Sequence, residues 1–126
     1  MRKKKITLYK GQYFFVECAI RTNGNSESKD FLDSLDNSQR AKIMKVINRY
    51  ADFGKIFNKE KFKKVGGSIF EFKDFQTRIL MYQCDRRCIV LTHGFIKKGG
   101  RTPKKEIDKA NQIMGEYNSV RGGLLP

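Results

Sequence analysis

Hydrophobic residues in the first half of the chain recur mainly at helical spacing. The clearest stripe is made of Ile43, Val46, Ile47, Tyr50 and Phe53. Apolar positions at i, i+3, i+4 and i+7 fall on one face of an α-helix. Gly54 can end this helix, because glycine readily adopts the left-handed conformation of a helix terminus. The pattern therefore predicts a long amphipathic helix that ends before Gly54. A short helix is expected around residues 31–35, ahead of the long one.

Strand-like segments lie on either side of these helices. Residues Gln12–Arg21 are rich in Tyr, Phe, Val and Ile, which favour strands. Further along, three apolar runs follow one another: Ser68–Lys73, Thr77–Cys84 and Cys88–Lys97. Their connections of about three residues cannot hold a crossover helix, so we expect neighbouring strands to be antiparallel.

A final helix is expected after Thr102-Pro103, because proline is tolerated in a first helical turn. Its apolar stripe consists of Ile107, Ala110, Ile113 or Met114, and Tyr117. The predicted fold is α+β, with a four-stranded antiparallel sheet that becomes mixed through its N-terminal strand. Two N-terminal helices are expected on one face, together with a C-terminal helix. Residues 1–118 would form the domain and residues 119–126 a flexible tail.

Alternation along the first of the three runs predicts which face of the sheet is covered. Phe70 and Phe72 point to one side and are expected in the core. Glu71 and Lys73 point to the other side, which we expect to be partly open. Functional side chains would then lie on the face that carries Glu71 and Lys73.

Charge changes this picture by indicating the class of partner. The chain has 27 Lys and Arg residues against 13 Asp and Glu, a formal net charge of +14. Such an excess favours polyanions, which gain from counterion release. Nucleic acid, an acidic protein and an anionic membrane all fit this charge.

Other features of the composition narrow the setting. No stretch approaches the roughly 20 apolar residues of a transmembrane helix, and no apolar segment typical of a signal peptide follows the basic start. We therefore expect a cytoplasmic protein with no membrane partner. The odd number of cysteines predicts free thiols at Cys18, Cys84 and Cys88. A two-thiol metal or redox site at Cys84 and Cys88 is the alternative, although further metal ligands at suitable spacing are missing.

The most distinctive basic segment is THGFIKKGGRTPKK (92–105), which contains no acidic residue. Its cationic residues are Lys97, Lys98, Arg101, Lys104 and Lys105. A loop that leads into a helix N-terminus offers backbone N–H groups to a phosphate, and the lysines add charge. The alternative is an ordinary solvated basic loop.

Three further side chains have both a functional and a structural interpretation. Arg78, expected beside Lys73, suits a phosphate in a transition state, or it pairs with Glu71 across the sheet. His93 is either a hydrogen-bonded core residue or a proton-transfer group. Tyr82 is either a core aromatic or a stacking platform for an RNA base.

Several catalytic classes leave no trace in the sequence. It has no P-loop, no HExxH motif, no ligand-spaced Cys/His set and no clustered carboxylates of a two-metal nuclease. RNA cleavage would therefore proceed without a metal, through attack by the ribose 2′-OH and stabilisation of the phosphorane by cations. A lysine of depressed pKa, a histidine or a tyrosine would move the protons. DNA lacks the 2′-OH, so this route selects RNA.

Four segments carry a family resemblance through their order and spacing: GGSIFEFK (66–73), QTRILMYQ (76–83), THGFIKKGG (92–100) and TPKKEIDKA (102–110). They are similar to the RelE/HigB-like toxins, particularly the phage-derived branch. That branch carries an E-L-R strand, a Y-R-I-L strand, a strand ending in H-G-F-x-K-K and a T-P-x-x-E-I-x-x-A helix. The likeness extends over about residues 12–117.

The resemblance implies a function, a partner and a set of site residues. The function is that of a type II toxin: a ribosome-dependent mRNA endoribonuclease (mRNA interferase) that needs no cofactor and inhibits translation. The partners would be mRNA on the ribosome and a HigA-like helix-turn-helix antitoxin. The candidate catalytic residues are Arg78, Lys73, Lys97, Lys98 and His93. Apart from the resemblance, the candidate RNA-binding residues are Arg101, Lys104, Lys105, Tyr82 and Glu71.

The chain departs from the family pattern at two places. Lys73 replaces the arginine of the E-L-R strand, which keeps the charge but loses bidentate phosphate contact. Gly99-Gly100 replaces the polar residue that usually follows the lysine pair. Two other functions therefore stay open: a non-catalytic basic nucleic-acid-binding module of phage or ribosome-associated type, and a protein-interaction domain that meets an acidic partner.

Overall fold

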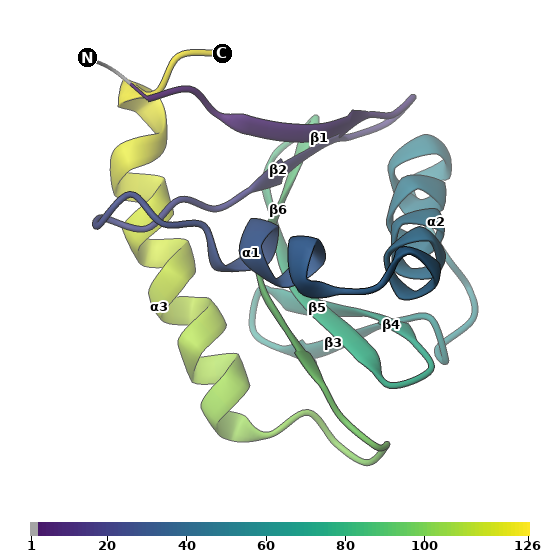
Figure 1. The fold of residues 1–126 in the computed structure, drawn as a ribbon. Coiled ribbons are helices and arrows are strands. Elements are labelled where there is room, and N and C mark those ends of the chain that lie inside the picture. Colours follow the sequence, from purple (N-terminus) through teal and green to yellow (C-terminus); the bar gives the residue numbers. More distant parts are fainter. Residues whose placement is uncertain (1–2) are drawn as a thin grey trace.

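The computed structural model describes residues 3–126 as a six-stranded sheet with three α-helices (Figure 1). In chain order, the elements are β1 (Ile6–Lys10), β2 (Phe15–Cys18), α1 (Glu27–Ser34), α2 (Asn37–Phe53), β3 (Phe62–Gly66), β4 (Ile69–Asp74), β5 (Thr77–Asp85), β6 (Cys88–Ile96), α3 (Lys104–Val120) and the short 3₁₀ helix η1 (Arg121–Gly123). The strand order is β1-β2-β6-β5-β4-β3. β2 pairs in parallel with β6, and the other neighbours are antiparallel. The sheet is therefore mixed.

Local sequence signals set the ends of the long helix α2. The Asp36 side chain accepts a hydrogen bond from the backbone of Gln39, and the Gln39 side chain accepts one from the backbone of Asp36. This reciprocal capping box satisfies two backbone donors that the first turn leaves unpaired. Gly54 ends the helix with a φ of 77°, a left-handed conformation that glycine adopts without steric cost. The predicted helix before Gly54 is confirmed.

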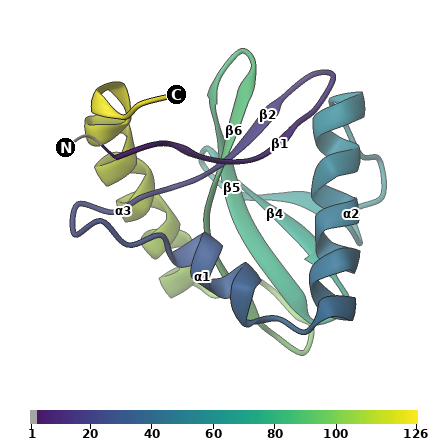
Figure 2. The same cartoon turned by 45° about the horizontal axis from the view of Figure 1, so that its top comes forward.

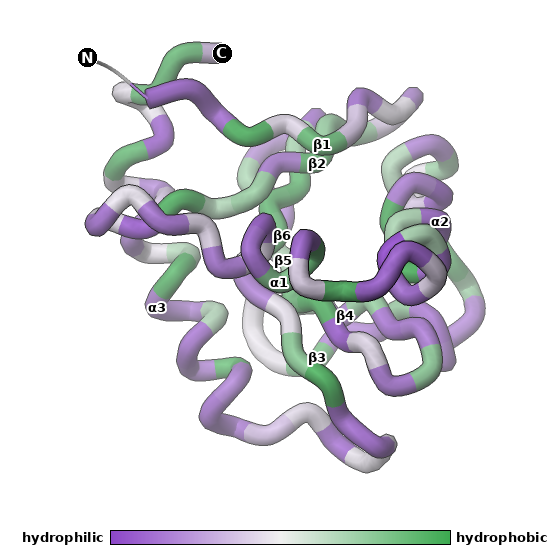
Figure 3. Tube along the Cα trace, in the orientation of Figure 1, coloured by the Kyte–Doolittle hydropathy of each residue, from purple (hydrophilic) through white to green (hydrophobic). Residues whose placement is uncertain are grey.

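Helices cover both faces of the sheet, as Figures 1 and 2 show. α1 and α2 pack on one face, over a core that includes Ile43, Ile47, Phe72, Ile79 and Leu91. α3 packs on the opposite face, over a second core that includes Leu80, Tyr82, Val90, Ala110, Ile113 and Tyr117. Figure 3 shows hydrophilic residues along much of the length of α2 and α3. Two buried layers therefore hold the sheet between the helices.

The structure corrects two parts of the predicted fold. The α+β class and the antiparallel β4–β5–β6 meander are confirmed, but the sheet has six strands and not four. The additional strands are the two edge strands, β1 and β3, and the predicted strand Gln12–Arg21 shrinks to β2. The face expected to be partly open is largely covered by α3, and Glu71 on that face is buried. The physical reason is the α3 stripe, which buries its apolar side chains against Leu80 and Tyr82.

The beginning of the described chain, Lys3–Lys5, lies beside Leu125 at one end of α3. Arg121 donates to both carboxylate oxygens of Glu17, at 3.0 and 2.9 Å, and the backbone N–H of Leu125 donates to the Lys3 carbonyl. Whether residues 119–126 form a separate flexible tail stays a prediction. Among the helices of residues 3–126, none is long and apolar enough to cross a membrane.

Candidate functional site

The centre of the predicted site is a buried pair of opposite charges on the α3 side of the sheet. Arg78 is only 2% exposed and Glu71 only 1%, on the adjacent strands β5 and β4. Arg78 Nε lies 3.8 Å from Glu71 Oε2, and Arg78 Nη1 donates to the Phe75 carbonyl at 2.6 Å. Within residues 3–126, Arg78 Nη2 and Glu71 Oε2 have no hydrogen-bond partner. Arg78 therefore lies beside Glu71 of the neighbouring strand, as its structural interpretation expects.

Glu71 also ties the segment before α3 to the sheet. Thr102 Oγ1 donates to Glu71 Oε1 at 2.5 Å, and Lys63 Nζ of β3 lies 3.9 Å from Glu71 Oε2. A carboxylate can accept several hydrogen bonds, so one buried side chain links two strands and a loop. The loop that carries the predicted basic segment is therefore anchored to the carboxylate that pairs with Arg78.

A cationic groove of about 600 Å³ lies beside this anchor, between β3 and the start of α3. Its charged lining residues are Lys63, Lys64, Arg101 and Lys104, and no carboxylate of residues 3–126 lines it. We call it the β3–α3 groove. Lys104 Nζ already pairs with Asp108 at 2.8 Å on the exposed side of α3. The start of α3 has Pro103 as its N-cap and no side-chain cap hydrogen bond. A groove with this lining is suited to a phosphate group.

The remaining predicted lysines lie at the same end of the sheet. Lys73 is opposite Arg78 in the β4–β5 register, and its Nζ lies 3.5 Å from Glu60 Oε2. Lys97 follows β6, and its backbone N–H donates to the Gln76 carbonyl at 2.8 Å. Lys98 is exposed on the loop that follows. The structure therefore brings Lys73, Arg78 and Lys97 together at one end of β4, β5 and β6.

Gly99 and Gly100 have a structural reason to be glycines. Their φ angles are 88° and 78°, in the left-handed region that residues with a Cβ rarely adopt. The departure from the family pattern thus coincides with a tight change of chain direction between β6 and α3. It shapes the loop that carries Lys97 and Lys98.

His93 lies inside the structure and not at its surface. Its ring is 2% exposed, with Nε2 3.2 Å from Glu106 Oε1 of α3 and Nδ1 3.2 Å from Thr92 Oγ1. Burial lowers the pKa of His93, and the Glu106 hydrogen bond opposes this only in part. A neutral, buried imidazole that bridges β6 and α3 fits the core-histidine interpretation. The role of His93 in proton transfer stays a prediction. The buried ring does not line the β3–α3 groove.

Three predicted RNA-binding residues do not line the groove: the buried Glu71 described above, Tyr82 and Lys105. Tyr82 is 2% exposed, and its hydroxyl donates to Asn118 Oδ1 at 2.9 Å beneath α3. Burial raises the pKa of Tyr82 far above its usual value. Its ring offers no open face to a base, which fits the core-aromatic interpretation. Lys105 is exposed on α3 but is not among the residues that line the groove.

Lys63 and Lys64 line the groove but are not among the site residues predicted from the sequence. They lie in a segment for which the sequence pattern predicts no helix or strand, yet residues Phe62–Gly66 form the edge strand β3. The available signal was the position of Phe62 and Val65 on either side of the two lysines. Within residues 3–126, no group of His, Cys, Asp or Glu side chains is arranged to hold a metal ion. The three cysteines are free thiols.

Comparison with known proteins places the chain in a family. The model of the family described as "Phage derived protein Gp49-like (DUF891)" matches residues 30–115, which is more than half of the 126 residues. A search of curated proteins finds no match. The matched region runs from α1 into α3 and includes the buried pair, the β3–α3 groove and the basic loop. The chain therefore belongs to the Gp49-like family of phage-derived proteins, a toxin-like family of toxin–antitoxin systems.

Proposed function

We propose that the chain is the toxin of a toxin–antitoxin pair and acts as a metal-independent mRNA endoribonuclease on the ribosome. It would inhibit translation in the cytoplasm until a HigA-like helix-turn-helix antitoxin binds it. The observation that carries the proposal is the carboxylate-free cationic lining of the β3–α3 groove, in a chain that belongs to a toxin-like family.

The chemistry assigned to this groove is transesterification within RNA. The ribose 2′-oxygen attacks the adjacent phosphorus, a new O2′–P bond forms, and the P–O5′ bond breaks. The products are a 2′,3′-cyclic phosphate and a 5′-hydroxyl end. Solvent accepts the 2′-OH proton and supplies one to the departing 5′-oxygen. The protein contributes fixed positive charge where the phosphorane gathers negative charge.

The residues divide into contacting and positioning groups. Lys63, Lys64 and Arg101 hold the phosphate in the groove, and Lys97 and Lys98 extend the cationic wall along the loop. Arg78 acts through Glu71, because it is buried and its pair with Glu71 holds Thr102 in place. Arg78 is therefore a positioning residue in this proposal.

Induced expression in cells tests the proposal. Expression of the chain alone should stop growth and fragment mRNA, and co-expression of a helix-turn-helix protein encoded next to it should restore growth. The Lys63→Gln/Lys64→Gln variant should relieve toxicity. Arg86→Gln/Arg87→Gln, which removes the same charge from the exposed β5–β6 turn, should not. Normal growth with intact mRNA in the absence of antitoxin would refute the toxin assignment.

The burial of Arg78 and His93 favours a second candidate, a basic RNA-binding module without catalysis. Such a module would bind RNA with strong salt dependence, because its affinity would come from phosphate contacts. It would leave no cyclic-phosphate ends. RNA end chemistry therefore separates the two candidates.

A further inference from the structure

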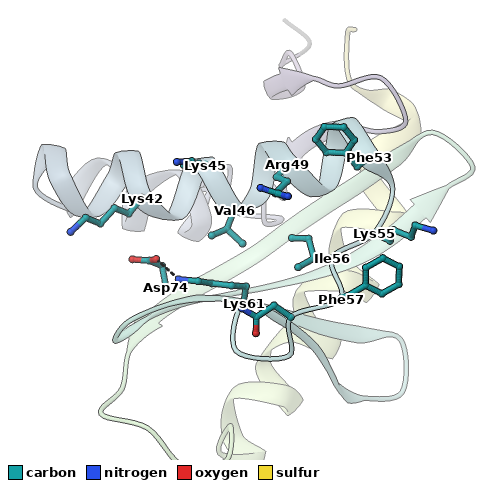
Figure 4. Close-up of a pocket in the computed structure, with 11 residues that line it drawn as sticks. Lys42, Lys45, Val46, Arg49, Phe53, Lys55, Ile56, Phe57, Lys61 and Asp74 are labelled. Carbon is teal, nitrogen blue, oxygen red and sulfur yellow. Dashed lines mark hydrogen bonds and ion pairs between the residues drawn. The ribbon is translucent and has the colours of Figure 1, made fainter.

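A second and larger groove lies on the opposite side of the sheet edge, between α2 and the chain that enters β3 (Figure 4). Its volume is about 790 Å³. We call it the α2 groove. Five cationic side chains line it: Lys42, Lys45, Arg49, Lys55 and Lys61. No motif in the sequence indicates a role for any of them.

The charge of the α2 groove is almost uncompensated. In the described part of the chain, Asp74 is its one acidic lining residue, and this carboxylate accepts a hydrogen bond from Lys61 Nζ at 2.8 Å. Among the lining residues, this is the single ion pair within residues 3–126. Lys42, Lys45 and Arg49 occupy successive turns of α2 and span about 10 Å along the helix axis. Such a row follows an extended polyanion and not a single small anion.

Exposed aromatic rings accompany these charges. Phe53 at the end of α2 is 63% exposed, and Phe57 on the following segment is 84% exposed. The Arg49 guanidinium lies 5.9 Å from the Phe53 ring centre, and Lys55 Nζ lies 5.0 Å from the Phe57 ring centre. Aromatic rings of this kind offer faces on which unpaired bases stack. Figure 4 shows both rings at the end of the groove where Lys55 lies.

The two grooves share the edge strand β3. Lys61, immediately before β3, lines the α2 groove, whereas Lys63 and Lys64 line the β3–α3 groove. A cationic surface therefore continues around this edge of the sheet, from the α2 side to the α3 side. One polyanionic chain could contact both grooves in succession.

We infer that the α2 groove binds single-stranded RNA, with Phe53 and Phe57 stacking on bases and the α2 cations contacting phosphates. A duplex is not the expected ligand, because its bases are already stacked on one another. The choice of RNA over other single strands rests on the proposed function. An acidic amphipathic peptide would also meet cations beside apolar residues, but it would not need an aromatic face.

Binding to an uncleavable probe tests this inference. The probe is a fully 2′-O-methylated single strand of about 12 nucleotides, within the range of site sizes for such surfaces. It lacks the 2′-OH nucleophile, so the full-length wild-type protein leaves it intact. Affinity is measured by fluorescence anisotropy at about 50 to 200 mM salt, with the same strand in a duplex and an acidic amphipathic peptide as competitors.

Two pairs of variants give the expected results. Phe57→Leu keeps an apolar side chain but removes the aromatic face, and should weaken single-strand binding about tenfold, whereas Phe57→Tyr should keep it. Lys42→Gln/Lys45→Gln should lower the slope of log affinity against log salt by about 1.4, at about 0.7 per phosphate contact. Arg86→Gln/Arg87→Gln removes equal charge outside both grooves and should leave the slope unchanged.

Three outcomes overturn the inference. The first is wild-type affinity in both Phe57→Leu and Lys42→Gln/Lys45→Gln, and the second is tighter binding of the duplex than of the single strand. The third is displacement of the probe by the acidic peptide from both the wild type and Phe57→Leu, with equal affinity of the peptide for the two proteins. The binding result is independent of cleavage. If the groove variants lose binding and native RNA is never cut, the proposed nuclease activity fails while this inference stands. If native RNA is cut but the groove variants bind the probe normally, this inference fails while the proposed nuclease activity stands.

Discussion

Removing one member of the buried Arg78–Glu71 pair should destabilise the fold strongly, whereas removing both should cost little. Arg78→Met leaves the Glu71 carboxylate buried, with Lys63 at 3.9 Å and the Thr102 hydroxyl as its remaining polar neighbours. Glu71→Leu leaves the Arg78 guanidinium buried, with the Phe75 carbonyl as its main acceptor. Both side chains are at most 2% exposed, so the stranded charge cannot be solvated.

The magnitude follows from this burial. Loss of one partner from a buried ion pair typically lowers the free energy of unfolding by about 3–5 kcal/mol, and here the lower value applies, because each partner keeps a polar neighbour. Replacement of both by apolar side chains is often nearly neutral. We expect each single variant to lose about 3 kcal/mol and the double variant Glu71→Leu/Arg78→Met to lose about 1 kcal/mol. The coupling between the two sites should therefore be about 5 kcal/mol.

Urea denaturation of the four proteins measures this coupling. The exposed pair Lys29–Asp33 on α1 serves as the control, with Nζ and Oδ2 only 2.7 Å apart. Despite this shorter distance, its coupling should be about 0.3–0.5 kcal/mol, because solvent screens it. Additive effects at Arg78 and Glu71, within about 0.5 kcal/mol, would refute the argument that burial makes this pair matter.

Three further outcomes are expected. Lys63→Gln/Lys64→Gln should lower the salt dependence of RNA binding by about 1.4 in slope, measured by anisotropy with Arg86→Gln/Arg87→Gln as the control; an unchanged slope would remove the β3–α3 groove from the binding site. Burial lowers the pKa of His93 in the folded protein below its unfolded value of about 6.5, so the folded state resists protonation. The contribution of His93 to stability is therefore present above about pH 6.5 and is lost as pH falls through the folded pKa. His93→Gln should flatten urea stability between about pH 7.5 and 5.5, and an equally steep pH dependence in that variant would contradict the assignment. Gly99→Ala, at a φ of 88°, should destabilise the fold by about 1 kcal/mol. Gly115→Ala inside α3, where a Cβ meets nothing within 4 Å, should stabilise it by about 0.5–1 kcal/mol. Thermal melts in which the melting temperature changes in the same direction for both variants would contradict the backbone argument.

The sequence predicts some elements well because their signals are local. α2 combines a five-residue apolar stripe with a capping residue at one end and Gly54 at the other. The β4–β5–β6 meander is predictable because its connections are too short for any other arrangement. β1 and β3 are not recognised, because basic residues precede one and interrupt the other, which hides strand alternation. Lysines on edge strands are common for a physical reason, since they discourage edge-to-edge pairing.

The site is less predictable than the fold because its contacts are long-range. Sequence spacing brings Arg78 and Lys73 together correctly, since both belong to one hairpin. It does not show that α3 covers this face, so the sequence leaves the functional and the structural interpretations of Arg78 and His93 open, and both side chains are found buried. The hydrogen bonds from Thr102 to Glu71 and between His93 and Glu106 depend on how α3 docks. No local pattern encodes that docking, and the groove formed by Lys63, Lys64 and Arg101 depends on it too.

The end chemistry of RNA exposed to the purified chain tests the central claim most directly. The protein is added to a translation extract with actively translating ribosomes, and the new ends of one mRNA are mapped. The account predicts fragments with 2′,3′-cyclic phosphate and 5′-hydroxyl ends, because attack by the ribose 2′-oxygen leaves these two ends. The fragments should disappear with Lys63→Gln/Lys64→Gln and persist with Arg86→Gln/Arg87→Gln. Intact mRNA, or ends of any other chemistry, would contradict it.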